Sequence, residues 1–192
     1  LKINRHTMAV DKAFPLAPAY KDVTAMRIDH PDVYVAASST ASDNKLVLLK
    51  IDKGLALQKI YDYPEDENVP YAMEVDDEFV YTGQYTFPGR VVKLRKSDLS
   101  VQGELELQAG EDDVRQLESD PTDPDDKYIY ANTNTVPGRI LKIRKADMAV
   151  ERSLTLAQGE DRPLAGIELD PEFLYVATNP VPGRVIKIRK AD

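Results

Sequence analysis

Short runs of apolar residues, separated by polar turns, follow one another along the whole chain. In residues 140–184 the run ILKIR is followed by ERSLTL, in which Leu154 and Leu156 alternate with Ser153 and Thr155. AGIELD and FLYVATN come next, separated by the turn sequence DPE. Short segments of this kind, rich in β-branched and aromatic residues, predict four β-strands. No segment has the apolar spacing of a long amphipathic helix, so we expect an all-β fold.

The same pattern recurs along the chain. In three nearly identical segments, FPGRVVKLRKSDLSV, VPGRILKIRKADMAV and VPGRVIKIRKAD, Arg139 lies 49 residues after Arg90, and Arg184 lies 45 residues after Arg139. A degenerate copy, SDNKLVLLKIDKGLAL, begins at Ser42, and the opening LKINRHTMAV matches LKIRKADMAV. Four short strands at this period are typical of a β-propeller blade. The predicted repeats form a single array over residues 1–192, at approximately 1–45, 46–90, 91–139, 140–184 and the start of a fifth at 185–192.

A resemblance to a known family rests on the segments between these runs. GEDRPLAGIELDPEFLYVATN (159–179) resembles the repeat of YVTN-type β-propellers, which are common in surface-layer-like proteins. The pattern recurs at 64–84 and more loosely at 110–133, and the resemblance covers essentially the whole chain. It implies four-stranded antiparallel blades whose innermost strands are AMEVD (72–76), GIELD (166–170) and their counterparts.

The number of strands is uneven. The VIKI-type strand occurs five times, whereas each of the other three types occurs four times. We therefore count about four blades and interpret the surplus strand as the start of a further one. A partial ring leaves the faces of its terminal blades uncovered, so we expect the chain to be part of a larger propeller or of an assembly of several copies.

Composition narrows the classes of function. The 192 residues include no cysteine and carry a formal net charge of −8, which excludes disulfides and disfavours nucleic acid as a partner. No apolar run approaches the roughly 18–20 residues that cross a bilayer, so we expect no membrane span. The two histidines, His6 and His30, fall at unlike places in their repeats, and no nucleophile elbow or phosphate-binding loop is present. We predict no catalytic residue, no metal and no cofactor.

Charged residues recur at two positions of the repeat. The family resemblance places the loop into the innermost strand and the PGR turn on one face. Repeated carboxylates can gather cations, but we favour the alternative that each acidic pair caps a turn and meets a nearby arginine in an ion pair. Arginine in turn suits the recognition of a carboxylate or a sugar acid. The candidate ligand or interaction residues are Arg90, Arg139, Arg184, Glu65, Asp66, Glu111, Asp112, Glu160 and Asp161.

Three further positions have structural interpretations. Gly89, Gly138 and Gly183 are expected to supply the left-handed conformation of a type II turn after proline. The basic residues of the VIKI-type strands, such as Lys93, are expected on solvated sides of strands. The tyrosines of the YVTN-type strands are expected to fill the space between blades. These tyrosines are Tyr34, Tyr81, Tyr130 and Tyr175.

The favoured hypothesis is a non-enzymatic structural or protein-interaction propeller whose partners are other proteins or further copies of itself. The family resemblance implies an extracellular or cell-surface location. The alternative is a propeller that binds, or acts on, a carbohydrate or small molecule at its central mouth. A structural module should show equivalent residues at each blade mouth, whereas a ligand site should break the symmetry with unique polar groups. The nearly interchangeable repeats favour the structural module.

Overall fold

The computed structural model describes residues 2–3, 6–16, 20–39, 46–64, 69–164 and 166–190. The regular elements in these ranges are all β-strands, as the sequence predicts. The described part of the chain holds no helix that is long and apolar enough to cross a membrane. The chain divides into two compact units, Leu1–Val69 and Pro70–Asp192, which are described separately.

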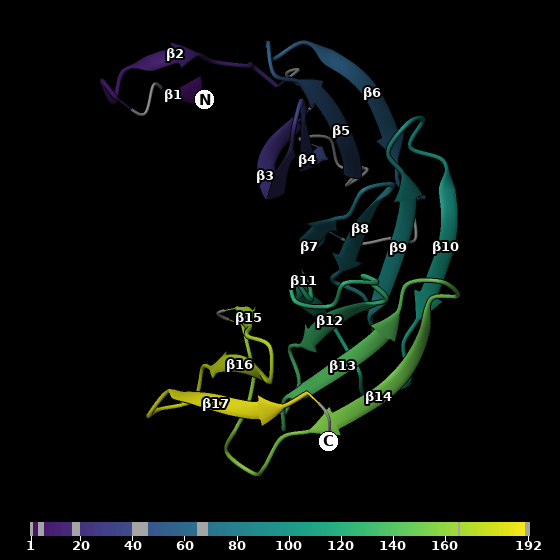
Figure 1. The fold of residues 1–192 in the computed structure, drawn as a ribbon, viewed down its shortest axis with the longest axis vertical. Helices are drawn as coiled ribbons and strands as arrows, with labels where there is room; N and C mark the ends of the chain where they lie inside the picture. Colours follow the sequence, from purple (N-terminus) through teal and green to yellow (C-terminus); the bar gives the residue numbers. More distant parts are fainter. Residues whose placement is uncertain are drawn as a thin grey trace. The chain divides into compact units, whose positions relative to one another are not determined.

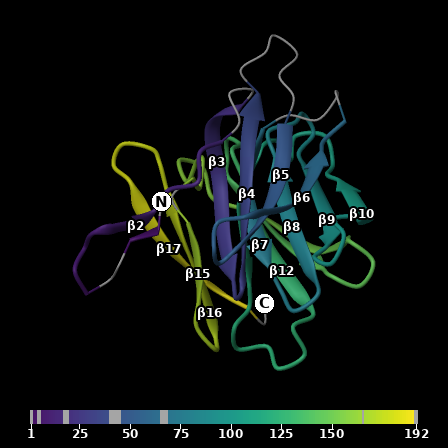
Figure 2. The same cartoon turned by 90° about the horizontal axis from the view of Figure 1, so that it is seen from above.

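The first unit contains a four-stranded antiparallel sheet, whose strands lie side by side in Figure 2. Its strands in chain order are β3 (Tyr20–Asp29), β4 (Asp32–Ser39), β5 (Leu46–Asp52) and β6 (Leu57–Asp62). A short β1 (Lys2–Ile3) pairs with β2 (Val10–Lys12). The β3–β6 sheet buries a cluster of aliphatic residues, namely Val35, Ala37, Val47, Leu49 and Ile51.

The second unit contains three sheets, in each of which every strand pairs with the next along the chain (Figure 1). The first sheet consists of β7 (Pro70–Val75), β8 (Phe79–Gln84), β9 (Arg90–Arg95) and β10 (Val101–Glu106). The second consists of β11 (Val114–Ser119), β12 (Tyr128–Thr133), β13 (Arg139–Arg144) and β14 (Ala149–Thr155). The third consists of β15 (Ile167–Leu169), β16 (Phe173–Thr178) and β17 (Arg184–Arg189). Strand β11 packs against β7 and β15, so the first strands of the three sheets lie together.

The sheets begin at a different point of the period from the predicted repeats. The VIKI-type strands are β9, β13 and β17, and each is the third strand of its sheet. Strand β17, which the sequence suggests as the start of a further blade, pairs with β16. Repeat spacing fixes the length of the unit, whereas hydrogen bonding decides where a sheet begins. The division into the five predicted ranges stays a prediction.

Apolar side chains fill the space between neighbouring sheets. Tyr81 from β8 and Val91 from β9 join Leu117, Ile129 and Leu141 of the next sheet in one buried cluster. A second cluster joins the β11–β14 sheet to the β15–β17 sheet. The predicted packing between sheets is confirmed for Tyr81 and Tyr130, which are 0% and 7% exposed members of these clusters. Tyr34 is also buried, whereas Tyr175 is only half-buried.

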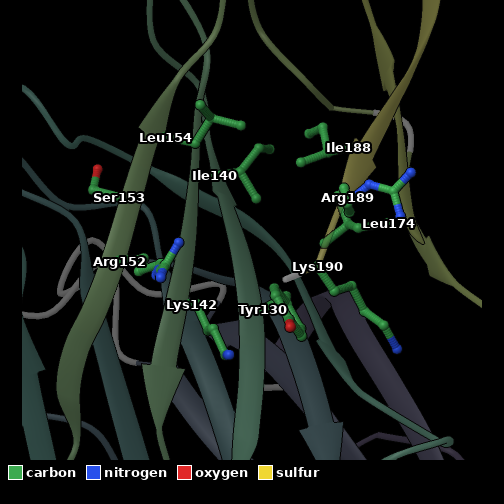
Figure 3. A pocket seen from close by; sticks show the side chains of 10 residues that line it. All are labelled: Tyr130, Ile140, Lys142, Arg152, Ser153, Leu154, Leu174, Ile188, Arg189 and Lys190. Atoms are coloured by element: carbon green, nitrogen blue, oxygen red, sulfur yellow. The ribbon is translucent and has the colours of Figure 1, made fainter. Parts of the chain in front are cut away.

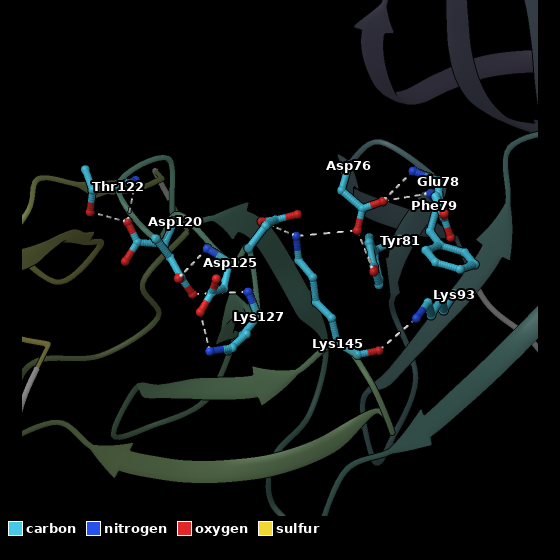
Figure 4. A network of polar contacts seen from close by, with 12 residues as sticks. Asp76, Glu78, Phe79, Tyr81, Lys93, Asp120, Thr122, Asp125, Lys127 and Lys145 are labelled. Carbon is cyan, nitrogen blue, oxygen red and sulfur yellow. Dashed lines mark hydrogen bonds and ion pairs between the residues drawn. The ribbon is translucent and has the colours of Figure 1, made fainter.

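A polar network joins the first two sheets of the second unit at the end where the β7–β8 turn lies (Figure 4). Lys145, which directly follows β13, donates from Nζ to Asp126 Oδ1 at 2.5 Å and lies 3.5 Å from Asp76 Oδ2 of the preceding sheet. Asp76 also accepts the Tyr81 hydroxyl at 2.7 Å and the backbone N–H of Phe79 at 2.7 Å. The network therefore couples a turn of one sheet to a strand end of the next.

A similar lysine–aspartate ion pair joins the second and third sheets, and we call these two contacts the lysine ties. Lys190, which follows β17, donates from Nζ to Asp120 Oδ2 at 2.6 Å and to Thr122 Oγ1 at 2.9 Å. Asp120 is the counterpart of Asp76 at the end of the first strand. A lysine from the third strand of one sheet thus reaches the turn of the sheet before it, twice in succession.

The strand lysines are not simply solvated. Lys93 is only 8% exposed and donates to the Lys145 carbonyl at 2.8 Å, so the expectation of a solvated side chain is wrong there. Cation–π contacts explain why lysine recurs at this strand position, because an ammonium over a ring face is attracted by the ring's negative potential. The three pairs, with their Nζ-to-centroid distances, are Lys93 over Phe79 (3.9 Å), Lys142 over Tyr128 (4.0 Å) and Lys187 over Phe173 (3.6 Å).

The PGR turns differ from the prediction. Gly89, Gly138 and Gly183 do not have positive φ, so the type II assignment is wrong. The glycines instead allow close approach of a neighbouring loop: the N–H of Gly89 donates to the Glu111 carbonyl at 2.8 Å, and that of Gly138 to the Glu160 carbonyl at 3.0 Å. A Cβ on Gly89 would lie 2.9 Å from that carbonyl oxygen, and one on Gly138 would lie 3.0 Å from its partner.

We expect Gly89→Ala to lower the free energy of unfolding by roughly 1–3 kcal/mol, because the added methyl forces a well-packed backbone apart. Gly183→Ala is the matched control. The nearest atom to its Cβ, the Thr178 carbonyl oxygen, is 3.4 Å away. Urea denaturation of the two variants provides the comparison, and equal stabilities would contradict the close-approach explanation.

A second expectation concerns the inter-sheet tie. Lys145→Met should lower the free energy of unfolding by about 2–4 kcal/mol, because it leaves the buried Asp76 carboxylate without its cation. Lys127, whose exposed ammonium pairs with Asp125 near the same turn, supplies the control. Lys127→Met should leave the denaturation midpoint unchanged, since exposed ion pairs contribute little. A loss of similar size in both variants would show that the tie has no special role.

Candidate functional site

One end of the second unit gathers seven of the nine charged residues that the sequence nominates, namely Arg90, Arg139, Arg184, Glu111, Asp112, Glu160 and Asp161. The turns 85–89, 134–138 and 179–183 join the second strand of each sheet to the third. The loops 107–113 and 156–164 lead into the next sheet, and backbone hydrogen bonds hold them against the first two turns. We call the surface formed by these five segments, together with the adjoining ends of the strands, the PGR face.

Glu111 is a structural centre of this face. It is 2% exposed, and its Oε2 accepts the backbone N–H of Gln108 at 3.1 Å. Its Oε1 accepts the Ser153 hydroxyl at 2.8 Å and Arg139 Nη1 at 3.4 Å. The carboxylate therefore caps its own loop and pairs with the arginine at the start of β13, which is the arrangement that the structural alternative predicts.

Glu160 repeats this arrangement in the next loop. Its Oε2 accepts the backbone N–H of Ala157 at 2.9 Å, and its Oε1 lies 3.7 Å from Arg184 Nη1. The Arg184 side chain is 48% exposed. Because both partners are in contact with water, this pair contributes little to stability.

The other nominated residues lie around these two pairs. Arg90 forms an ion pair with Glu106 of the adjacent strand at 3.4 Å, and Glu65 and Asp66 lie outside the described residues. Asp112 and Asp161 are half-buried. A ligand-binding role for the nominated residues stays a prediction.

Exposed apolar side chains precede the proline of each PGR turn. Phe87 is 64% exposed, Val136 is 65% exposed and Val181 is fully exposed. Tyr85 stacks edge-on against Phe87 at a centroid distance of 5.1 Å, and against Tyr71 at 6.0 Å. The PGR face thus presents apolar and aromatic groups beside its arginines.

Asp113 breaks the symmetry of this face. It is 1% exposed, although it lies in a loop, and its backbone has φ +56°. Its Oδ2 accepts Arg115 Nε and Asn134 Nδ2, each at 2.8 Å, whereas Oδ1 is buried without a hydrogen-bond partner among the described residues. The corresponding residue of the next loop is Arg162, which is exposed.

Burial dominates the electrostatics of Asp113. It raises the pKa of this carboxyl above its ordinary value, although the contacts with Asn134 and Arg115 act in the opposite direction. Asp76, at the other end of the sheets, behaves differently. Its burial also favours the neutral form, but hydrogen bonds from Tyr81 and from the N–H groups of Glu78 and Phe79 prevail and lower its pKa.

Arg115 connects Asp113 to the aromatic residues. Its guanidinium carbon lies 4.2 Å from the centroid of the Tyr71 ring and 5.3 Å from that of Tyr85. The Arg115 side chain is 25% exposed, and Nε is its donor to Asp113. Within the part of the chain that the structure describes, its two terminal nitrogens have no acceptor.

A pocket of about 500 Å³ lies between the second and third sheets (Figure 3). Its apolar walls include Ile140 and Leu154 on one side and Ile188 on the other. The ammonium of Lys142 pairs with Glu151, and that of Lys190 pairs with Asp120. Arg152 also lines the pocket and forms no ion pair within the part of the chain that the structure describes, so the pocket keeps one unmatched cation.

The described residues contain no group of three or more His, Asp or Glu side chains arranged to hold a metal ion. The oxygens of Glu111 are engaged by Gln108, Ser153 and Arg139. The acidic pairs therefore do not converge on a common point in this part of the chain.

Comparison with known proteins identifies the architecture. No known protein-family profile matches the sequence, and no curated protein matches it. The WD40 domain of Pan2 from Neurospora crassa has a similar structure, with a TM-score of 0.63 at 10% identity over 86% of this chain and 48% of that domain. The computationally designed protein Ika8 gives a TM-score of 0.63 at 12% identity, over 87% of this chain and 45% of Ika8. The chain spans about half the length of each.

WD40 domains are propellers of four-stranded antiparallel blades. Three sheets among the described residues have that topology, and the β15–β17 sheet has its first three strands. The fold is a β-propeller. About four blades are present, as the sequence predicts. At these identities the similarity shows the fold alone, because propellers carry many unrelated functions.

Sequence reasoning missed the propeller's most unusual polar group. Asp113, Arg115 and Asn134 do not recur as a set in the other repeats, so a search for repeated residues overlooks them. A signal was present, since GEDD at 110–113 carries an acid where GEDR at 159–162 carries a base. A residue that reverses charge within an otherwise similar repeat deserves a separate interpretation.

The opposite pKa shifts predict opposite pH dependences. The raised pKa of Asp113 gives stability that is present below about pH 4, the ordinary pKa of Asp, and is lost as pH rises through the raised value. The lowered pKa of Asp76 gives stability that is present above about pH 4 and is lost as pH falls through the lowered value. As pH rises above 4, wild type should therefore lose stability relative to Asp113→Asn, and as pH falls below 4 it should lose stability relative to Asp76→Asn. Thermal melts of all three proteins test this, and parallel profiles would contradict it.

Proposed function

We propose that this propeller is a non-enzymatic module that binds a protein partner through its PGR face. The supporting observation is the row of exposed apolar residues Phe87, Val136 and Val181, one on each successive turn, beside arginines and tyrosines. Tyrosine and arginine are enriched among the residues that dominate protein interfaces. Exposed apolar residues surrounded by polar ones are typical of an interaction surface.

The turns present these residues rigidly. Backbone hydrogen bonds from Gly89 and Gly138 fix two of the turns to the adjoining loops. A surface that is ordered before binding loses less conformational entropy when a partner docks. Rigid display of short apolar side chains therefore supports recognition of another folded protein or of a peptide segment.

The subtype and location are also part of the proposal. The repeat GEDRPLAGIELDPEFLYVATN supports a YVTN-type, surface-layer-like propeller, and with it a position outside the cell or on its surface. Further copies of the chain are candidate partners, because the sheets of the second unit pack against one another through apolar side faces.

A specific observation favours a second candidate function, a carbohydrate- or small-molecule-binding site at the mouth of the propeller. Asp113, Arg115 and Asn134 form a polar group found at one blade, and such asymmetry is what a single-ligand site requires. A glycan array probed with the full chain distinguishes this candidate from a protein-binding module.

The main experiment places a photo-crosslinking amino acid at position 136, and at position 101 as a control on the outer strand β10. We expect position 136 to crosslink a defined protein from the surface fraction of the source cells, and position 101 not to. With that protein purified, the combined Phe87→Ser, Val136→Ser and Val181→Ser variant should bind it at least about tenfold more weakly, because it removes the apolar centre of the interface.

A matched variant controls for general loss of hydrophobicity. Val101 is 36% exposed and Leu154 is 42% exposed, and both lie on outer strands. Val101→Ser combined with Leu154→Ser should leave affinity unchanged. The proposal fails if both sets of substitutions weaken binding equally, or if position 136 captures no defined protein.

A further inference from the structure

The geometry of Arg115 is that of an arginine prepared for an anion. Asp113 holds the guanidinium through Nε, at 2.8 Å, and leaves both terminal nitrogens without an acceptor among the described residues. The ring of Tyr71 supports its plane at 4.2 Å. A guanidinium fixed on one side and supported on one face offers its remaining donors in a single direction. That fork matches the two oxygens of a carboxylate.

We propose that Arg115 binds an Asp or Glu carboxylate of an extended peptide segment in the partner protein, with the neighbouring apolar residue of that segment packed on Phe87. This inference rests on the proposed protein-binding function of the PGR face. Asp113 is a positioning residue, because it acts through Arg115. Asn134 holds Asp113 in turn, through its Nδ2 at 2.8 Å.

The aromatic contacts favour a peptide over a sugar acid. Recognition of a sugar acid would pair its carboxylate with arginine and stack the pyranose ring on an aromatic face. At this site the guanidinium covers one face of Tyr71 and lies 5.3 Å from the centroid of Tyr85. Phe87 is the most exposed ring of the group, and it contacts Tyr85 edge-on. An apolar side chain beside a carboxylate fits this arrangement better than a pyranose ring.

The net charge of the chain does not oppose an acidic ligand at this site. The formal charge of −8 is spread over 192 residues. At physiological ionic strength, charges beyond about 8 Å are largely screened. The charges next to Arg115 therefore matter more than the net charge of the chain. The Asp113 carboxylate is one of them, and it occupies Nε while leaving the two terminal nitrogens for a ligand.

The test selects peptides from a random heptapeptide display library on the immobilised 192-residue chain. Wild type should enrich peptides that carry Asp or Glu next to an aromatic or aliphatic residue. Arg115→Gln should reduce this enrichment at least about tenfold, because a charge-assisted, bidentate contact is lost. Phe87→Ser should reduce it too. Arg144→Gln, which changes a 43% exposed arginine paired with Asp147, should have no effect.

A second variant shows whether a loss of peptide binding comes from misfolding. Arg115→Lys keeps the charge but not the fork, so it should give an intermediate enrichment, and its melting temperature shows whether the chain is folded. The inference is overturned if acidic peptides are not enriched, or if their enrichment survives Arg115→Gln. Arg115-dependent binding of polygalacturonate without peptide enrichment would also overturn it, in favour of a sugar acid.

Failure of this inference can be told apart from failure of the proposed function. Enrichment of non-acidic peptides that disappears in Phe87→Ser would keep the protein-binding role and reject the carboxylate. Absence of any enriched peptide, together with no crosslinked protein from position 136, would reject both.

Discussion

A lysine that leaves the third strand of one sheet and reaches the turn of the sheet before it sets the arrangement of the second unit. Apolar packing between sheets is non-directional, so it brings two sheets together without fixing how far one slides along the other. The contact of Lys145 with Asp76 limits that freedom, because Asp76 belongs to the β7–β8 turn of the preceding sheet. Asp126, in the β11–β12 loop of the same sheet as Lys145, holds the lysine in position. Lys190 repeats the constraint one sheet later.

The two ends of the sheets therefore have different roles. At the end with the lysine ties, the charged side chains form ion pairs and hydrogen bonds that join neighbouring sheets. At the PGR face, the glycine N–H groups bond to the carbonyls of Glu111 and Glu160, and the buried Glu111 carboxylate adds side-chain contacts. Since these groups hold the turns and loops together, the side chains of Phe87, Val136 and Val181 are left exposed and available to a partner.

The sequence predicts the fold well because its information is periodic. Strand positions follow from apolar runs, and the repeated tyrosines indicate their packing. The start of a sheet could not be predicted, since a period looks the same from any origin. The role of Gly89 could not be predicted either, because a close approach depends on a loop more than twenty residues away at Glu111.

The candidate site was predictable only where it obeys the repeat. Glu111 and Glu160 occupy the same position of the repeat, and each carboxylate accepts a backbone N–H of its own loop. The role of one could therefore be predicted from the other. Arg115 and Asp113 have no such counterpart, and their meaning depends on Asn134 and Tyr71, which other strands bring to the same place. Contacts between separate blades cannot be deduced from the repeat period of the sequence.

The fold itself does not require an acid at position 113. In the next loop Arg162 has φ +48°, close to the +56° of Asp113, and each residue donates its N–H to the carbonyl of the preceding turn's threonine at 3.0 Å. The same backbone is thus built with an exposed base in place of a buried acid. Burial makes ionisation of Asp113 costly, so its presence is unexplained by the turn. Asp113 orients Arg115 by accepting the hydrogen bond from its Nε. This supports a ligand-binding role for the arginine.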